Sequence, residues 1–287
     1  MFPPDPVFGD DHFREPLPTL GLSGAGRGLH TPRLMTTQAD HNAGKGTIDA
    51  DEVRSFSAVA DQWWDQNGPF KPLHRLNPVR VGYLRDRMAA HFDHHAASER
   101  PLEGLRVADV GCGGGLVTEP LARLGASMTG LDASSQAIDV ARRHAENSGL
   151  TISYQNRPVE DLAHEQPQFD ALVAMEIIEH VADREGFVAA CCRCVRPGGL
   201  LLFSTLNRTP KSFALAIVGA EYLLQWVPRG THTWSKFVRP SELARDLRRN
   251  NVVVNDVSGL VLDISTNHWS LGRDVDVNYI LSAPKSA

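Results

Sequence analysis

The sequence predicts an α/β domain built on a mostly parallel sheet with helices on both faces. Two observations support this prediction. From residue 106 onward, short apolar runs alternate with longer segments of helical periodicity, which is typical of strand–helix–strand units. A glycine-rich segment directly follows the first apolar run, where a strand-to-helix loop can approach a ligand. Ligands of this fold class bind beyond the carboxyl ends of the strands, so we expect the functional residues there.

Composition divides the chain into three parts, at residues 1–46, 47–98 and 99–287. The first part is rich in Gly and Pro and has no apolar periodicity, so we interpret it as a disordered leader. Met35 is then an alternative start of translation. A mitochondrial targeting segment is the other interpretation, but such segments avoid acidic residues, and several are present here.

The second part predicts two helices that precede the sheet. Apolar residues recur every three or four positions after Asp49 until Gly68 ends the pattern, which predicts the first helix. Asn77 is a suitable N-cap for the second helix, with Pro78 in its first turn.

The third part predicts seven strands with helices between them. The predicted strands are residues 106–110, 127–131, 152–154, 169–174, 200–204, 252–256 and 277–282. The last one follows a long loop, and we expect it to form an antiparallel edge of the sheet. The clearest helix is predicted at residues 134–148, where Gly149 ends it, and another begins near Asp183 and ends before Arg196.

Charge and cysteine usage exclude several classes of protein. The formal net charge is −5, from 29 Lys and Arg against 34 Asp and Glu, so the chain lacks the overall basic field that binds nucleic acid. Cys191, Cys192 and Cys194 are grouped in one predicted helix, where we interpret them as packing residues and not as a disulfide framework or a C-x-x-C site. No apolar stretch reaches the roughly 20 residues of a membrane-spanning helix. We therefore expect a cytoplasmic protein.

Gly111, Gly113 and Gly115 form a G-x-G-x-G loop at the end of the first strand. This spacing differs from the G-x-G-x-x-G pattern of dinucleotide sites. Asp132 ends the second strand 21 residues after Gly111, where a carboxylate can accept hydrogen bonds from both hydroxyls of a ribose. A helix cap is the alternative role for Asp132, but its pairing with the loop favours a nucleoside-type ligand.

These motifs resemble those of the S-adenosylmethionine-dependent methyltransferases, which have a Rossmann-like seven-stranded sheet. Further segments closely resemble the ubiquinone biosynthesis O-methyltransferase family, and they extend from about residue 50 to residue 283. These segments are residues 63–65, 70–78, 175–180, 204–208, 218–222, 230–232 and 276–279. The resemblance implies that the N-terminal helices cover the cofactor site and that residues 208–238 form a helical lid insert.

The resemblance also implies how S-adenosylmethionine binds. Arg80 would hold the carboxylate of the methionine part, because a guanidinium meets both oxygens of a carboxylate. The three loop glycines would line the ligand, and Asp132 would bind its ribose. Met175, at the end of the fourth strand, would lie along the ligand. From spacing alone, Arg80 would be interpreted as a solvated residue on a helix.

Glu176, Glu179 and His180 follow the fourth strand at positions i, i+3 and i+4. If this turn is helical, all three project from one face into the cleft. Two carboxylates and an imidazole suit Mg²⁺ or a similar divalent ion, and the catechol-like acceptors that the resemblance implies can chelate such an ion. The alternative is an acidic helix N-terminus with a packed histidine. These three residues are our candidates for catalysis and metal binding, and none is assigned as the sole base.

Residues 212–228 are mostly apolar and are flanked by Arg208, Lys211 and Arg229. The segment is too short to span hydrocarbon, but its aromatic residues and basic flanks suit a membrane interface. A buried helix is the alternative. We expect a substrate lid that also contacts the inner face of the plasma membrane.

The resemblance implies an S-adenosylmethionine-dependent O-methyltransferase with Mg²⁺ as a second cofactor. Its acceptors would be polyprenylated phenols and catechols of the 2-polyprenyl-6-hydroxyphenol and 3-demethylubiquinol type. A complex with other ubiquinone-pathway enzymes is a further expectation, and a nucleic-acid partner is not expected. Two alternatives stay open: a methyltransferase with another acceptor, and a noncatalytic S-adenosylmethionine-binding scaffold of a quinone-making complex.

Overall fold

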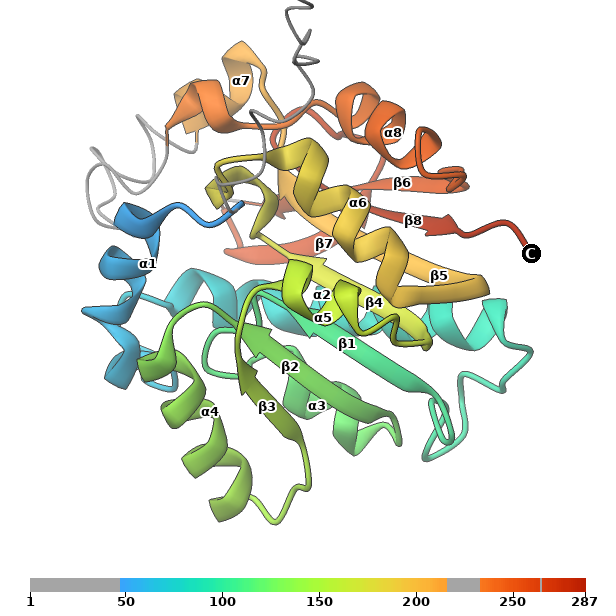
Figure 1. Cartoon of the computed structure of the whole chain (residues 1–287). Coiled ribbons are helices and arrows are strands. Elements are labelled where there is room, and N and C mark those ends of the chain that lie inside the picture. Colours follow the sequence, from blue (N-terminus) through green and yellow to red (C-terminus); the bar gives the residue numbers. More distant parts are fainter. Residues whose placement is uncertain (1–46, 216–232, 264) are drawn as a thin grey trace, which may run out of the picture. The chain divides into compact units, whose positions relative to one another are not determined.

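The computed structural model describes residues 47–215, 233–263 and 265–287. The predicted leader, residues 1–46, and residues 216–232 of the predicted lid insert lie outside the described residues. Residues 45–287 form one compact unit, and Figure 1 shows its helices and strands.

One sheet of eight strands runs through the described residues, in the order β3-β2-β1-β4-β5-β8-β6-β7. The strands are β1 (Arg106–Val110), β2 (Ser127–Asp132), β3 (Ser153–Asn156), β4 (Phe169–Met175), β5 (Val195–Leu206), β6 (Asp256–Asp263), β7 (His268–Gly272) and β8 (Asn278–Pro284). The first five strands in this order pair in parallel, and β8, β6 and β7 each pair with their neighbours antiparallel. The predicted α/β class is confirmed. Strand order reverses direction at β1, so the ligand site is expected at the carboxyl ends of β1 and β4.

The C-terminal strands differ from the prediction. β6 starts at Asp256, where the predicted strand ended. The apolar residues before it form a connection: Val252 is fully buried but pairs only through one bridge to Lys285. The sequence did not reveal β7, because most residues of this edge strand are exposed and lack apolar alternation. β8 is antiparallel as predicted, but β6 and β7 lie outside it, so it is not the edge of the sheet.

Helices cover both faces of the sheet (Figure 1). They are α1 (Ala50–Ser57), α2 (Lys71–His91), α3 (Thr118–Arg123), α4 (Ser135–Asn147), α5 (Val159–His164), α6 (Arg184–Cys194), α7 (Pro210–Ser212) and α8 (Pro240–Arg248), with shorter turns η1 (Ala60–Gln62), η2 (Ile178–His180) and η4 (Trp234–Lys236). Neighbouring residues of the central strands point to opposite faces. Ala108 and Leu172 join the core beneath α5, α6 and α8, whereas Val107 and Ala171 join the core beneath α2 and α3.

Two predicted helix starts are confirmed. Ser134 is the N-cap of α4, and its side chain accepts a hydrogen bond from the backbone N–H of Ala137 at 3.2 Å. Asp183 is the N-cap of α6 and accepts from the backbone N–H of Gly186 at 3.1 Å. These side chains satisfy N–H groups that have no partner within the helix, which is why their positions could be read from the sequence.

The first N-terminal helix is shorter than predicted. α1 ends at Ser57, and η1 and several turns follow up to Gly68. In this stretch Trp63 stacks on Phe70 with ring centroids 3.8 Å apart. The apolar residues after Ser57 therefore lie in turns, where they form a small aromatic cluster, and do not continue the helix.

The second N-terminal helix starts earlier than predicted. α2 begins at Lys71, so Asn77 lies within the helix and is not its N-cap, and Pro78 is also inside the helix. Proline cannot donate a backbone hydrogen bond and normally limits a helix to the residues that follow it. Here Leu76, one turn into the helix, is buried in the core. Tertiary packing of the first turns outweighs the missing hydrogen bond, which the sequence alone did not reveal.

All four cysteines are free thiols with buried side chains. Cys191, Cys192 and Cys194 belong to α6 and are buried in the core that this helix covers, which confirms that they are packing residues. None of the described helices is long and apolar enough to cross a membrane.

Candidate active site

A cavity of about 880 Å³ lies at the carboxyl ends of the parallel strands. Its walls come from the glycine loop after β1, the ends of β2 and β4, the segment that begins at Thr47, the first turns of α2 and the β6–β7 hairpin. Every sequence-predicted site residue except Gly115 contributes directly to this lining. The topology therefore brings together residues that are up to about a hundred positions apart in the sequence.

The glycine loop requires glycine for backbone reasons. Gly111 and Gly113 have φ angles of +74° and +52°, which side-chain-bearing residues rarely adopt. A Cβ atom at Gly111 would lie 2.6 Å from Cγ1 of Ile177, and one at Gly113 would overlap the ring of Trp63. The loop backbone consequently lies directly against the cavity. Gly115 also has a positive φ, but it packs behind the loop against Tyr154.

Asp132 joins the end of β2 to the glycine loop. One carboxylate oxygen accepts from the backbone N–H of Gly113 at 2.9 Å, and the other accepts from that of Ser134 at 2.8 Å. Burial raises the pKa of Asp132 despite these hydrogen bonds. Each carboxylate oxygen has a further lone pair, so the group can also accept from ligand hydroxyls.

Arg80 is a buried cation beside the cavity, with 2% of its surface exposed. Its Nη2 donates to Oδ1 of Asn77 at 3.2 Å, and its Nε atom has no hydrogen-bond partner in the described part of the chain. Burial lowers the pKa of Arg80, while the charges of Glu176 and Asp109 raise it. No ion pair within 4 Å joins Arg80 to a described carboxylate. A buried guanidinium in this state is suited to bind an anionic ligand group.

Asp109 is a site residue that the sequence analysis did not single out. It is 2% exposed at the end of β1 and accepts from Oγ1 of Thr118 at 2.6 Å. Burial raises the pKa of Asp109 to about 6, although the hydrogen bond from Thr118 and the charge of Arg80 both lower it. An acidic residue inside an apolar strand, two positions before Gly111, was the available signal.

Glu176, Glu179 and His180 do not lie on one helical face, so that prediction was wrong. Glu176 has a φ of +53°, and only residues 178–180 form a helical turn, the 3₁₀ turn η2. The reason is that the backbone N–H of Glu176 still bonds to the carbonyl of Ser204 at 3.0 Å, which continues the pairing of β4 with β5. Strand pairing therefore extends past the position where a helix was expected.

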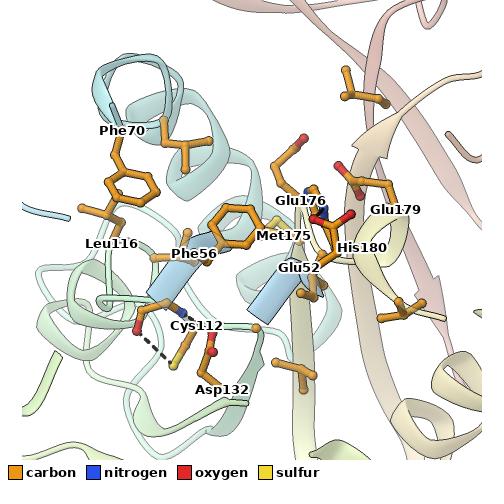
Figure 2. A pocket seen from close by; sticks show the side chains of 18 of the residues that line it. Glu52, Phe56, Phe70, Cys112, Leu116, Asp132, Met175, Glu176, Glu179 and His180 are labelled. Carbon is orange, nitrogen blue, oxygen red and sulfur yellow. Dashed lines mark hydrogen bonds and ion pairs between the residues drawn. The ribbon is translucent and has the colours of Figure 1, made fainter. Parts of the chain in front are cut away.

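The three side chains nevertheless lie along the same wall of the cavity (Figure 2). Ser204 donates to Oε1 of Glu176 and Thr205 donates to Oε2 of Glu179, both at 2.7 Å. Glu179 is 4% exposed, and burial together with the charge of Glu176 raises its pKa to about 7. No group of three or more His, Cys, Asp or Glu side chains among the described residues is arranged to hold a metal ion.

His180 has a partner that the sequence did not indicate. Its Nδ1 lies 3.1 Å from Oε2 of Glu52 on α1, and the ring of Phe56 packs edge-on against it at 5.1 Å. Burial lowers the pKa of His180, but the hydrogen bond to Glu52 and the charge of Glu179 outweigh this effect and raise it. Glu52 is 128 positions away in the sequence, so no local pattern could have found this contact.

Comparison with known proteins identifies the family. A family described as "Methyltransferase domain" matches residues 108–203, which run from β1 into β5. The chain is 50% identical over 243 residues to the "Ubiquinone biosynthesis O-methyltransferase" of Chelativorans sp., covering 85% of this chain and 96% of that protein. It is 51% identical over 250 residues to the protein of the same name from Methylocella silvestris, covering 85% and 97%. The chain belongs to the ubiquinone biosynthesis O-methyltransferase family.

Solved structures agree on the fold of this family. A possible histamine N-methyltransferase from Thermotoga maritima is 14% identical, covers 82% of this chain and 99% of its own, and has a TM-score of 0.54. The magnesium protoporphyrin IX methyltransferase of Synechocystis with bound SAH is 17% identical, covers 80% and 100%, and has a TM-score of 0.51. Membership of the family confirms the predicted recognition and enzyme class, an S-adenosylmethionine-dependent O-methyltransferase.

The buried carboxyl of Glu179 should make the stability of the protein depend on pH. Its pKa rises from 4.5 in the unfolded chain to about 7 in the folded one, so the folded state binds the extra proton and loses stability as the pH rises between these values. Glu179→Gln does not titrate. As the pH rises from 4.5 to 7.5, the unsubstituted protein should lose about 2 to 3 kcal/mol of its free energy of unfolding relative to Glu179→Gln.

Urea unfolding at several pH values in a chelating buffer measures this difference. The control is Glu146→Gln, because Glu146 is exposed on α4 and forms no ion pair with another described residue, so this substitution removes no buried carboxyl. A constant difference for Glu179→Gln as well would show that folding does not raise the pKa of Glu179.

Proposed function

We propose that this chain transfers the methyl group of S-adenosylmethionine to a phenolic hydroxyl of polyprenylated ubiquinone precursors. The acceptors are of the 2-polyprenyl-6-hydroxyphenol and 3-demethylubiquinol type. One observation carries the proposal: a single cavity is lined by the buried Arg80, by Asp132 and by the wall of Glu176, Glu179 and His180, called the carboxylate–histidine wall. The Nε atom of Arg80 has no hydrogen-bond partner among the described residues. The chain covers 96% and 97% of two relatives named "Ubiquinone biosynthesis O-methyltransferase", and this supports the acceptor class.

In the proposed cofactor site, the carboxylate and the ribose of S-adenosylmethionine each meet a complementary residue. Arg80 binds the carboxylate of the methionine part, which satisfies the Nε–H that otherwise has no partner among the described residues. Asp132 accepts from the ribose hydroxyls, and the backbone at Gly111 and Gly113 lies along the ligand. Met175, 7% exposed at the end of β4, packs against it.

In the proposed acceptor site, apolar residues line the cavity next to the carboxylate–histidine wall. Leu73 and Leu76 from α2 line the cavity together with residues of the β6–β7 hairpin, where Leu262 pairs with Trp269 across the strands. Such a surface suits the isoprenoid tail of the acceptor, because burial of apolar area is favourable at about 25 cal/mol per Å². The hydroxyl-bearing ring then lies next to Glu176, Glu179 and His180.

Mg²⁺ fits the chemistry of this wall. Glu176 and Glu179 are close enough for the charge of one to raise the pKa of the other, and a divalent cation relieves that repulsion. Mg²⁺ is commonly held by one or two carboxylates and completes its shell with water and substrate oxygens, so a three-ligand protein cage is not required. Glu176 and Glu179 would hold it, which leaves His180 as the proton acceptor, and the ion would lower the pKa of a bound phenol.

The residues of the chain itself orient the reaction. The acceptor oxygen attacks the sulfonium methyl carbon in line with the departing sulfur, so the C–S bond breaks as the C–O bond forms and S-adenosylhomocysteine leaves as a neutral thioether. The phenol proton passes to the carboxylate–histidine wall, where Glu179 and His180 are both within the cavity lining. The buried walls exclude water and hold the two reactants in one geometry.

Residues 208–238 are proposed as the lid, with residues 212–228 as a peripheral contact with the membrane. The start of this insert supports the proposal, because Phe213 and Leu215 are 46% and 43% exposed and Leu215 lines the cavity. An acceptor that dissolves in the bilayer must cross from lipid to the cavity, and a lid at the membrane surface shortens that path. A complex with other ubiquinone-pathway enzymes stays a prediction.

Methyl transfer to a short-chain catechol tests the function directly. Purified protein with S-adenosylmethionine and Mg²⁺ should give the singly methylated catechol, and a chelator should lower the rate at least tenfold because the phenol is then less acidic. Mass spectrometry of the products measures both. No product under any condition would leave the scaffold alternative, and an undiminished rate in chelator would exclude the metal.

Arg80→Met should weaken S-adenosylmethionine binding by a factor of about 30 to 100, because a charge-assisted bidentate contact is lost. The same substitution should change the affinity for 5′-methylthioadenosine less than threefold, since that nucleoside lacks the carboxylate. Calorimetric titration measures both ligands. Equal losses for the two would show that Arg80 supports the fold of the site and does not bind the carboxylate.

Deletion of residues 212–228 should abolish flotation of the protein with vesicles that contain anionic lipid, because the apolar segment and its basic flanks supply the contact. Intact protein and vesicles of neutral lipid serve as comparisons. Turnover of the short-chain catechol by the deletion variant confirms that it is folded. Equal flotation of the intact and deleted forms would remove the membrane proposal.

A further inference from the structure

The N-terminal segment lies directly against the residues around His180. The carbonyl of Thr47 accepts from the backbone N–H of Ala182 at 2.7 Å, and Ile48 forms an antiparallel bridge with Val181. Thus the chain before α1 is held at the two residues that follow His180. These backbone contacts place α1 beside the carboxylate–histidine wall.

Glu52 is the α1 residue that reaches this wall. Its two carboxylate oxygens have different partners: Oε2 lies 3.1 Å from Nδ1 of His180, and Oε1 accepts from Nζ of Lys236 at 2.9 Å. Lys236 also donates to Oδ2 of Asp49 at 2.9 Å, and Asp49 is the N-cap of α1. The carboxylate of Glu52 is therefore fixed from both sides. Figure 2 shows Glu52 beside His180, and both residues line the cavity.

A carboxylate in this position determines which nitrogen of a histidine carries the proton. A neutral imidazole that donates its Nδ1–H to Glu52 has its lone pair on Nε2. The same bond restricts rotation of the ring, which Phe56 also contacts edge-on. Carboxylate partners of this kind set the tautomer and orientation of histidines that bind a metal or accept a proton.

We propose that Glu52 is a positioning residue for His180 and that Lys236 holds Glu52 in place for this task. The inference rests on the proposed function, because it assigns a role to His180 in methyl transfer. Lys236 belongs to η4, near the end of the insert at residues 208–238, and Glu52 belongs to α1, which precedes the sheet. The carboxylate–histidine wall is then completed by two residues 184 positions apart in the sequence, and neither lies at the end of a parallel strand.

Glu52→Gln tests the positioning role with little change in volume. Turnover of a short-chain catechol should fall by a factor of 10 to 100, the usual loss when such a partner is removed, while the dissociation constant for S-adenosylhomocysteine stays within twofold. Asp51→Asn is the matched control, because Asp51 is one position away on α1, 83% exposed and not part of the cavity lining. Its turnover should equal that of the unsubstituted protein.

Nitrogen NMR of the imidazole rings gives a readout that does not need turnover. In the unsubstituted protein above the pKa of His180, its ring should carry the proton on Nδ1, and Glu52→Gln should shift the population toward the Nε2–H form. The signal is assigned by its loss in His180→Asn. Failure of the proposed function would abolish turnover in all proteins but leave this tautomer difference intact.

Lys236→Met distinguishes positioning of His180 from simple docking of α1. It removes the contact that holds Glu52 but leaves the Glu52–His180 hydrogen bond, so turnover should fall less than in Glu52→Gln and the Nδ1–H form should persist. The proposal is overturned if Glu52→Gln turns over within twofold of the unsubstituted protein, if its His180 tautomer is unchanged, or if Lys236→Met loses as much activity as Glu52→Gln.

Discussion

The buried charge of Arg80 is the constraint on which the arrangement of the site depends. A guanidinium removed from water is costly unless anionic groups compensate it, and here Asp109 and Glu176 act on it without forming a direct ion pair. The two acids come from the ends of adjacent strands, β1 and β4, so the parallel pairing of the sheet sets their separation from the cation. The space left beside Arg80 is the cavity in which an anionic ligand group completes the charge balance.

Helix α2 delivers this cation, and its anchoring lies far from the chemistry. Leu84 and Met88 on α2 are completely buried against the sheet, and the hydroxyl of Tyr83 donates to Asp256 on β6 at 2.7 Å. The strands β8 and β6 therefore have a structural role in the site, because β6 holds the helix that carries Arg80. Residues of the same hairpin also line the cavity, so the hairpin both holds α2 and forms part of the cavity wall.

The sequence was sufficient for the parts of the site that local rules determine. Gly111 and Asp132 could be located because a positive φ and a strand-end carboxylate each leave a pattern at fixed spacing. Glu52 could not, since its role exists only when α1 packs beside His180. The prediction that Glu176 lies on a helical face was wrong for the same reason. Its spacing from Glu179 and His180 is typical of a helix, but the pairing of β4 with β5 continues through Glu176. Long-range contacts, and not residue propensity, determine these positions.

The distribution of acids also bears on the direction of the proposed transfer. S-Adenosylmethionine enters with a positive sulfonium, and after methyl transfer that charge has moved to the proton of the acceptor hydroxyl. Glu179 and Glu52 both raise the pKa of His180, and in the proposed reaction they would stabilise a proton that leaves the phenol. Asp132, on the cofactor side, is already engaged by the backbone of Gly113 and Ser134. In the proposed reaction, the carboxylates of Glu179 and Glu52 thus lie beside the group that receives the proton, which favours methyl transfer.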